Sequence, residues 1–118
     1  LIWAGAFNPL WYIENGVMKE IKADKQPIGY VEEPKSFTNH TLHLHTNDAV
    51  YLFTDGFADQ FGGPKGKKYK YKQLEEKLLA NSSKSLEKQK QLLTESFNNW
   101  KGNLEQVDDV TIIGIKFT

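Results

Sequence analysis

The sequence contains no cysteine and no arginine. Without cysteine, the chain has no disulfide, no thiolate nucleophile and no cysteine-based zinc site. All 15 basic residues are lysines, so a phosphate group would be held by lysine, by backbone N–H groups or by a metal ion, and not by the guanidinium fork of arginine. Because no apolar run approaches the roughly 20 residues that cross a bilayer, and no signal peptide is evident, we expect a soluble segment without membrane contact.

The charges of the chain cancel. The 15 acidic residues balance the 15 lysines, giving a formal net charge of zero. Bulk charge therefore gives no support for binding to nucleic acid or to an anionic membrane. A length of 118 residues suits one domain. The chain starts within a strand-like pattern and not at a methionine, so we expect it to be a piece of a longer protein.

The first half of the chain predicts β-structure. Residues 10–13 and 17–21 flank Asn15-Gly16, which is the strongest short signal for a hairpin. Residues 38–46 alternate between apolar and polar side chains, as a half-buried strand does. The continuous apolar run at residues 49–53 is typical of a buried strand.

The second half of the chain changes to a helical period. Apolar residues recur at helical spacing in two segments, at Tyr71, Leu74, Leu78 and Leu79 and then at Leu86, Leu93, Phe97 and Trp100. Ser85 is a suitable N-cap for the second helix, and Lys101-Gly102 is a suitable end. A last strand is expected from Val107 and residues 110–117. This order predicts an α+β fold with an antiparallel or mixed β-sheet and helices on one face.

Two acidic sites adjoin strongly apolar strands. Asp55 follows the run at residues 49–53 and precedes Gly56, and Asp108-Asp109 precedes the last strand. Carboxylates beside buried strands are costly unless they are neutralised, and Mg²⁺ or Mn²⁺ neutralises them well. From the spacing alone, a simple Asp-Gly turn and a solvated start of a strand explain the same residues.

Four segments resemble motifs of the SpoIIE-type phosphatases, which belong to the metal-dependent, protein phosphatase 2C-like superfamily. Residues 50–59 (VYLFTDGFAD) resemble the family's TDG segment, and residues 107–111 (VDDVT) resemble its closing DD-x-T motif. Residues 4–10 (AGAFNPL) resemble the AG-x-x-NP hairpin, and residues 27–29 (PIG) resemble the PLG turn. The four motifs stand in the family's order and cover essentially the whole chain.

The resemblance implies that residues 1–118 are the C-terminal part of a phosphatase domain, half of an α/β/β/α sandwich. It further implies two Mn²⁺ or Mg²⁺ ions that activate a water molecule for hydrolysis of phosphoserine or phosphothreonine on a protein. The positions that it assigns are the metal ligands Asp55 and Asp108, the auxiliary Asp109, and the supporting Thr54, Gly56 and Thr111.

One part of the family pattern is missing. The D-G-x-G-H-G motif, which carries the remaining metal ligands, has no counterpart in residues 1–118. We therefore expect the isolated chain to be inactive. For the complete protein, the resemblance implies a cytoplasmic phosphatase that acts on a phosphorylated signalling protein, such as an anti-sigma-factor antagonist. The alternative is a non-catalytic phosphatase-like module for interaction or dimerisation, and exposed strand faces would favour a homodimer.

Three further features permit a functional and a plain structural interpretation. His43 and His45 share one face of a strand and could bind a metal ion, although two solvent-facing polar residues are commoner. The run at residues 65–72 contains five lysines and could guide an acidic or phosphorylated partner or stack single-stranded nucleic acid. A solvated loop explains it more simply. The three tryptophans fit core positions.

Overall fold

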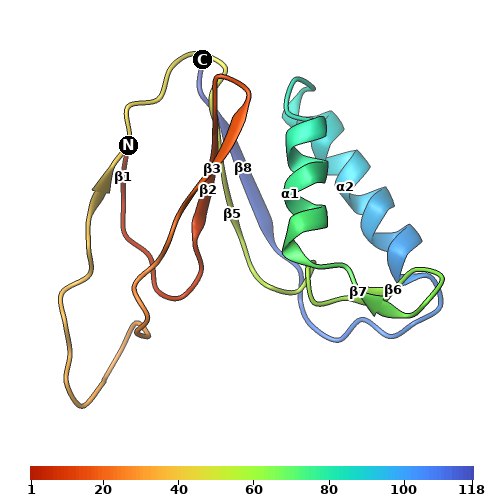
Figure 1. Cartoon of the computed structure of the whole chain (residues 1–118), viewed down its shortest axis with the longest axis horizontal. Helices are drawn as coiled ribbons and strands as arrows, with labels where there is room; N and C mark the ends of the chain where they lie inside the picture. The colour runs from red at the N-terminus through yellow and green to blue at the C-terminus, as the bar shows by residue number, and fades with distance from the viewer. The chain divides into compact units, whose positions relative to one another are not determined.

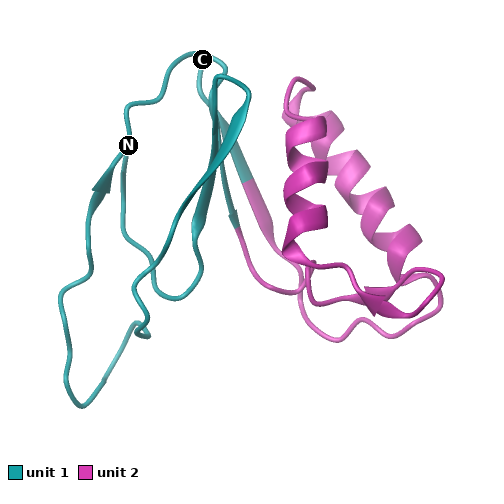
Figure 2. Cartoon of the chain, in the orientation of Figure 1, with its two compact units in different colours: residues 1–52, 114–118 teal, residues 53–113 magenta.

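The structure, a computed structural model that describes residues 1–118, confirms the α+β class with eight strands and two helices (Figure 1). In chain order the elements are β1 (Ile2–Trp3), β2 (Leu10–Glu14), β3 (Val17–Ile21), β4 (His40–Thr41), β5 (Ala49–Phe53), β6 (Phe61–Gly62), β7 (Lys67–Lys68), α1 (Tyr71–Ala80), α2 (Leu86–Lys101) and β8 (Ile112–Lys116). They form two compact units, residues 1–52 with 114–118 (unit 1) and residues 53–113 (unit 2) (Figure 2).

The largest sheet has four strands in the order β3-β2-β5-β8. Strands β2 and β3 form the predicted antiparallel hairpin, in which Leu10 pairs with Ile21 and Glu14 with Val17. Asn15 and Gly16 have φ values of 51° and 75°. Two consecutive residues with positive φ give the turn whose twist matches that of the strands, which is why Asn-Gly is favoured there.

The core of unit 1 forms around Leu10, Leu42 and Val50, with Trp3 and Phe117 packed against them. The prediction of a strand over residues 38–46 is largely wrong. Only the two residues of β4 pair, and their partners are the two residues of β1. The predicted alternation of side chains nevertheless holds, with Leu42 buried.

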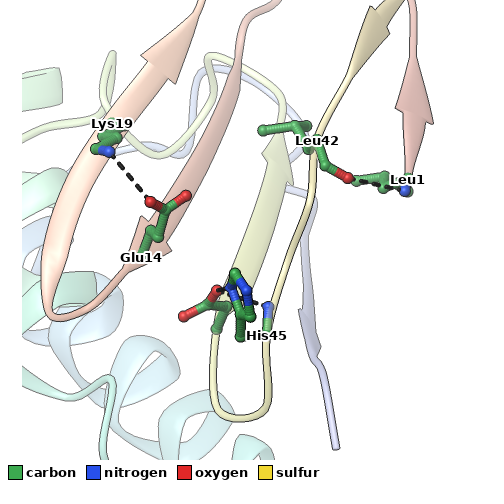
Figure 3. A network of polar contacts seen from close by, with 6 residues as sticks. Leu1, Glu14, Lys19, Leu42 and His45 are labelled. Atoms are coloured by element: carbon green, nitrogen blue, oxygen red, sulfur yellow. Dashed lines mark hydrogen bonds and ion pairs between the residues drawn. The ribbon is translucent and has the colours of Figure 1, made fainter.

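Hydrogen bonds hold both ends of residues 42–48, the segment that follows β4 (Figure 3). The amino group of Leu1 donates to the carbonyl oxygen of Leu42 over 3.1 Å. At the other end, His45 N–H donates to a carboxylate oxygen of Asp48 over 2.8 Å, which closes the turn into β5. These hydrogen bonds hold residues 42–48 in place of the longer strand predicted over residues 38–46.

Unit 2 combines the two helices with a core of aromatic rings. Phe57 packs edge-on against Tyr69 and Phe97, with ring centres 5.0 and 5.1 Å apart, and Tyr69 packs edge-on against Trp100. Edge-on pairs place the positive edge of one ring against the negative face of the next. Helix α2 begins as predicted, because the hydroxyl of Ser85 accepts a hydrogen bond from Lys88 N–H.

Two predictions about the second half need correction. The segment before α1 was expected to be a loop, but it contains the β6–β7 hairpin, in which Phe61 pairs with Lys68. Gly62 allows this because a Cβ atom there would collide with the carbonyl oxygen of Trp100. The last strand starts at Ile112, later than predicted, and Val107 lies in an exposed irregular segment.

Lys70, just before α1, has φ 76° and ψ 151°, a region that is essentially restricted to glycine. We predict that Lys70→Gly is more stable than Lys70→Ala by about 1 kcal/mol, because glycine adopts this conformation without steric strain. Urea unfolding followed by circular dichroism measures the difference. In the control pair at Lys72, inside α1, glycine should be less stable than alanine by about 1 kcal/mol. Equal stabilities for the two Lys70 variants would contradict the prediction.

Candidate metal centre

Thr54 joins the ends of β5 and β8. Its backbone N–H donates to the carbonyl oxygen of Thr111 over 3.0 Å, and Thr111 N–H donates to the Thr54 hydroxyl oxygen over 3.1 Å. The Thr54 hydroxyl also lies 3.5 Å from the carbonyl oxygens of Asp109 and Thr111. Because each residue of the pair donates to the other, the chain leaving β5 lies fixed beside the chain that enters β8.

Gly56 brings the two segments still closer. A Cβ atom on this residue would collide with the carbonyl oxygen of Asp109 and would lie 3.2 Å from a methyl group of Val110. Only glycine therefore fits at this position without moving the backbone of the Asp108-Asp109 segment. The structure thus shows both the turn expected at Asp55-Gly56 and a close approach of two backbones.

The structure places the predicted acidic residues at these two adjoining segments. Asp55 is exposed at the start of a turn in which Asp59 N–H donates to the Asp55 carbonyl oxygen over 2.9 Å. Asp108 and Asp109 are also exposed, and the Asp108 carboxylate accepts a hydrogen bond from Asp109 N–H over 2.8 Å. The backbone contacts thus bring Asp55 and Asp109 to neighbouring segments.

These residues fit part of a site for a hard divalent cation. The ion pairs of the chain involve other carboxylates, those of Glu14, Asp48 and Asp59. Carboxylate oxygens are the donors that Mg²⁺ and Mn²⁺ prefer. However, no three acidic or histidine side chains within residues 1–118 converge closely enough to hold a metal ion. The segment therefore offers an incomplete set of ligands.

Tyr71, expected on a helix face and within the lysine-rich run, lies beside the acidic turn. Its ring packs against Phe53 with centres 6.0 Å apart. Partial burial raises the pKa of its phenol above the ordinary value of 10.0, and the nearby negative charges of Asp55 and Asp59 raise it further. The sequence pattern could not indicate this proximity, because the β6–β7 hairpin separates Tyr71 from Asp55 along the chain.

A buried amide anchors the segment that leads to Asp108. The side chain of Gln60 is fully buried, and its Nε2 donates over 2.9 Å to the carbonyl oxygens of both Phe61 and Glu105. Trp100 Nε1 in turn donates to the Gln60 carbonyl oxygen over 2.9 Å. The loop after α2 is thus tied to the turn that contains Asp55.

The histidines considered as metal ligands lie elsewhere. His43 and His45 are exposed, and no group of three ligands includes them. His45 Nδ1 lies 3.7 Å from Asp48 in the turn before β5. Of the tryptophans, Trp11 is buried, whereas Trp3 and Trp100 are half-buried.

Comparisons with known proteins agree with this fold. The structure matches the SiaA-PP2C domain of Pseudomonas aeruginosa with a TM-score of 0.89 and 26% sequence identity. The match covers 99% of this chain and 46% of that one, so the chain spans less than half of the solved domain. This likeness defines the fold as part of a protein phosphatase 2C-like domain.

The sequence comparison identifies the family. The family described as stage II sporulation protein E (SpoIIE) matches residues 1–118, and the chain belongs to this family. The resemblance found in the four motifs is therefore confirmed. No curated protein sequence gives a significant match. The structure contains no helix that is both long enough and apolar enough to span a membrane.

We predict that Thr54→Val weakens the connection between β5 and β8, because valine has the shape of threonine but no hydroxyl to accept from Thr111 N–H. The free energy of unfolding should fall by about 1–3 kcal/mol, and the Thr111 amide should exchange its hydrogen faster. Urea unfolding and hydrogen exchange measure the two effects. Thr54→Ser keeps the hydroxyl and should retain the protection of Thr111. Equal exchange in both variants would rule out the hydroxyl as the cause.

The raised pKa of Tyr71 predicts a loss of stability at alkaline pH. Below pH 10.0 the phenol is protonated in both the folded and the unfolded chain, so it contributes nothing. Above that pH the unfolded chain releases the proton more readily, and stability falls until the pH passes the folded-state pKa. Titration of the labelled Tyr71 ring by NMR should give a pKa above 10.0 that drops in Asp55→Asn. Glu87→Gln, on α2, serves as the control and should leave it unchanged.

Proposed function

We propose that the protein that contains this chain is a metal-dependent phosphatase that hydrolyses phosphoserine or phosphothreonine on a signalling protein. The observation that carries the proposal is the close approach of two acid-bearing segments, held by the paired hydrogen bonds between Thr54 and Thr111. Membership of the SpoIIE family and the likeness to a protein phosphatase 2C domain support it. Mn²⁺ or Mg²⁺ would supply an activated water molecule and positive charge next to the phosphate.

The residues of this chain would have distinct roles. Asp55 and Asp108 would hold the metal ions, and the Asp109 backbone N–H would orient the Asp108 carboxylate through their 2.8 Å hydrogen bond. Thr54 and Thr111 would fix the distance between the two segments, and Gly56 would allow that distance to be short. No side-chain nucleophile is required, in keeping with a chain that has no cysteine.

The remaining ligands would come from outside these 118 residues. The chain covers 46% of the solved domain that it resembles and holds no complete group of three ligands. We therefore infer that residues 1–118 are the C-terminal part of the catalytic domain and that the isolated segment is inactive. The family resemblance suggests a cytoplasmic phosphoprotein substrate of the anti-sigma-factor antagonist type.

We predict that Asp55→Asn and Asp108→Asn each lower the phosphatase kcat of the complete protein by at least about 100-fold, because an amide does not replace an anionic metal ligand. The measurement is Mn²⁺-dependent release of phosphate from a phosphoserine peptide. Glu95→Gln, an exposed position on α2, is the matched control and should stay within about twofold of the parent, as is usual for exposed positions.

Two results would contradict this function. Full activity of both aspartate variants would exclude them as ligands. A complete protein without any Mn²⁺- or Mg²⁺-dependent turnover would favour the alternative, a phosphatase-like module that only binds a partner. Turnover by residues 1–118 alone would refute the inference that the segment lacks part of the site.

A further inference from the structure

Unit 2 carries a dense group of lysines next to the acidic turn. Five of the chain's 15 lysines fall within residues 65–72, which contain no acidic residue and are called the lysine hairpin below. All five side chains are exposed, namely Lys65, Lys67, Lys68, Lys70 and Lys72. Lys68 pairs with Asp59 over 3.7 Å and lies 5.8 Å from the ring centre of Phe61, whereas the other four form no ion pair. A chain with zero net charge thus concentrates a third of its lysines in one segment of eight residues.

The backbone at Lys70 adds an independent observation. Its φ of 76° and ψ of 151° lie in a region that is strained for a residue other than glycine. The exposed Lys70 side chain is not part of the core of unit 2, so packing does not explain why a lysine stands there. Strained positions of this kind concentrate at sites of function. Gly63 and Gly66, between β6 and β7, also have positive φ, so the chain uses glycine at two nearby positions of this kind but not at residue 70.

The lysine hairpin is rigidly connected to the turn that begins at Asp55. Tyr69 N–H donates to the Gln60 carbonyl oxygen over 3.0 Å, and Lys70 N–H donates to the Ala58 carbonyl oxygen over 2.8 Å. The buried ring of Tyr69 fixes the hairpin to the aromatic core. The lysine hairpin is therefore held beside the turn that begins at Asp55 and does not sit on a free loop.

We propose that the lysine hairpin is the surface on which a phosphoprotein substrate docks an acidic segment adjacent to its phosphorylated residue. This inference rests on the proposed phosphatase function and names the chemical class of its substrate. Clustered lysines attract a negatively charged partner and orient it before contact. Lysine lacks the fixed fork geometry of arginine. A group of flexible lysines therefore suits an irregular acidic segment better than it suits a single carboxylate bound through both oxygens.

The other surfaces of unit 2 are less suited to an acidic segment. The groove between α1 and α2, with a volume of about 780 Å³, has two carboxylates, Glu76 and Glu95, and one lysine, Lys77, in its walls, so its charge does not favour an acidic segment. Single-stranded nucleic acid would need aromatic rings on which bases stack. Tyr69 is buried, so Tyr71, which is 41% exposed, is the single accessible ring in the lysine hairpin, and one ring does not form a stacking platform for successive bases.

The test measures binding separately from hydrolysis. Fluorescence anisotropy of the complete protein, in the presence of a chelator that stops turnover, compares two phosphoserine peptides. One carries Asp and Glu beside the phosphoserine, and the other carries Asn and Gln at the same positions. In Lys65→Glu/Lys67→Glu the Kd for the acidic peptide should rise about tenfold at low salt, whereas the Kd for the neutral peptide should change less than about twofold. The control Lys88→Glu/Lys90→Glu, with the same charge change on α2, should match the parent.

The outcomes separate this inference from the proposed function. The docking assignment would be overturned if Lys65→Glu/Lys67→Glu raised the Kd of both peptides equally. It would also be overturned if the control Lys88→Glu/Lys90→Glu raised the Kd of the acidic peptide as much. Either result would hold even if the protein is a phosphatase. Tighter binding of single-stranded DNA than of the acidic peptide, with the same lysine dependence, would also overturn it. If the acidic peptide binds through the lysine hairpin but is not hydrolysed after Mn²⁺ is restored, the docking assignment stands and the proposed phosphatase function fails.

Discussion

The exchange of hydrogen bonds between Thr54 and Thr111 is the contact on which the candidate site depends. Residues 54 and 111 are separated by the two helices and the β6–β7 hairpin, yet their backbones lie side by side through bonds of 3.0 and 3.1 Å. Asp55 and Asp109 are each within two residues of this pair. The exchange continues the pairing of β5 with β8 and holds two exposed carboxylate-bearing segments together although their charges repel each other.

Strand β5, which ends directly before Thr54, is buried and holds the start of the Thr54–Thr111 contact in place. In β5, Ala49, Val50, Tyr51 and Phe53 are buried, and the chain emerges at Thr54. Buried apolar strands are held in one register by packing, so the first exposed residues after them occupy a defined position. The acidic group can then be exposed and hydrated in the absence of metal while its backbone is already in place. Gln60 and Trp100 extend the same constraint to the loop that leads to Asp108.

The aromatic core of unit 2 serves the site in a second way. The edge-on contacts of Phe57 with Tyr69 and of Tyr69 with Trp100 hold the lysine hairpin next to the acidic turn. Positive and negative side chains are thereby kept on neighbouring but separate segments, with one ion pair, Lys68–Asp59, between them. Such separation leaves lysines available for a partner and leaves Asp55 available for a cation. The absence of arginine is compatible with this arrangement, since metal ions would neutralise the phosphate itself.

Local sequence determined the features that depend on neighbouring residues. The Asn15-Gly16 hairpin, the buried run of β5, the Ser85 cap and the α+β class follow from turn chemistry, periodicity and capping. The four motifs also indicated the SpoIIE family, which the family comparison confirmed. Only the tertiary structure decided the contacts between distant segments: the collision that reserves position 56 for glycine, the place of Tyr71 beside Asp55, and the β6–β7 hairpin packed on Trp100. The strands expected over residues 38–46 and from Val107 are shorter for the same reason, because a strand extends only as far as its partner's hydrogen bonds.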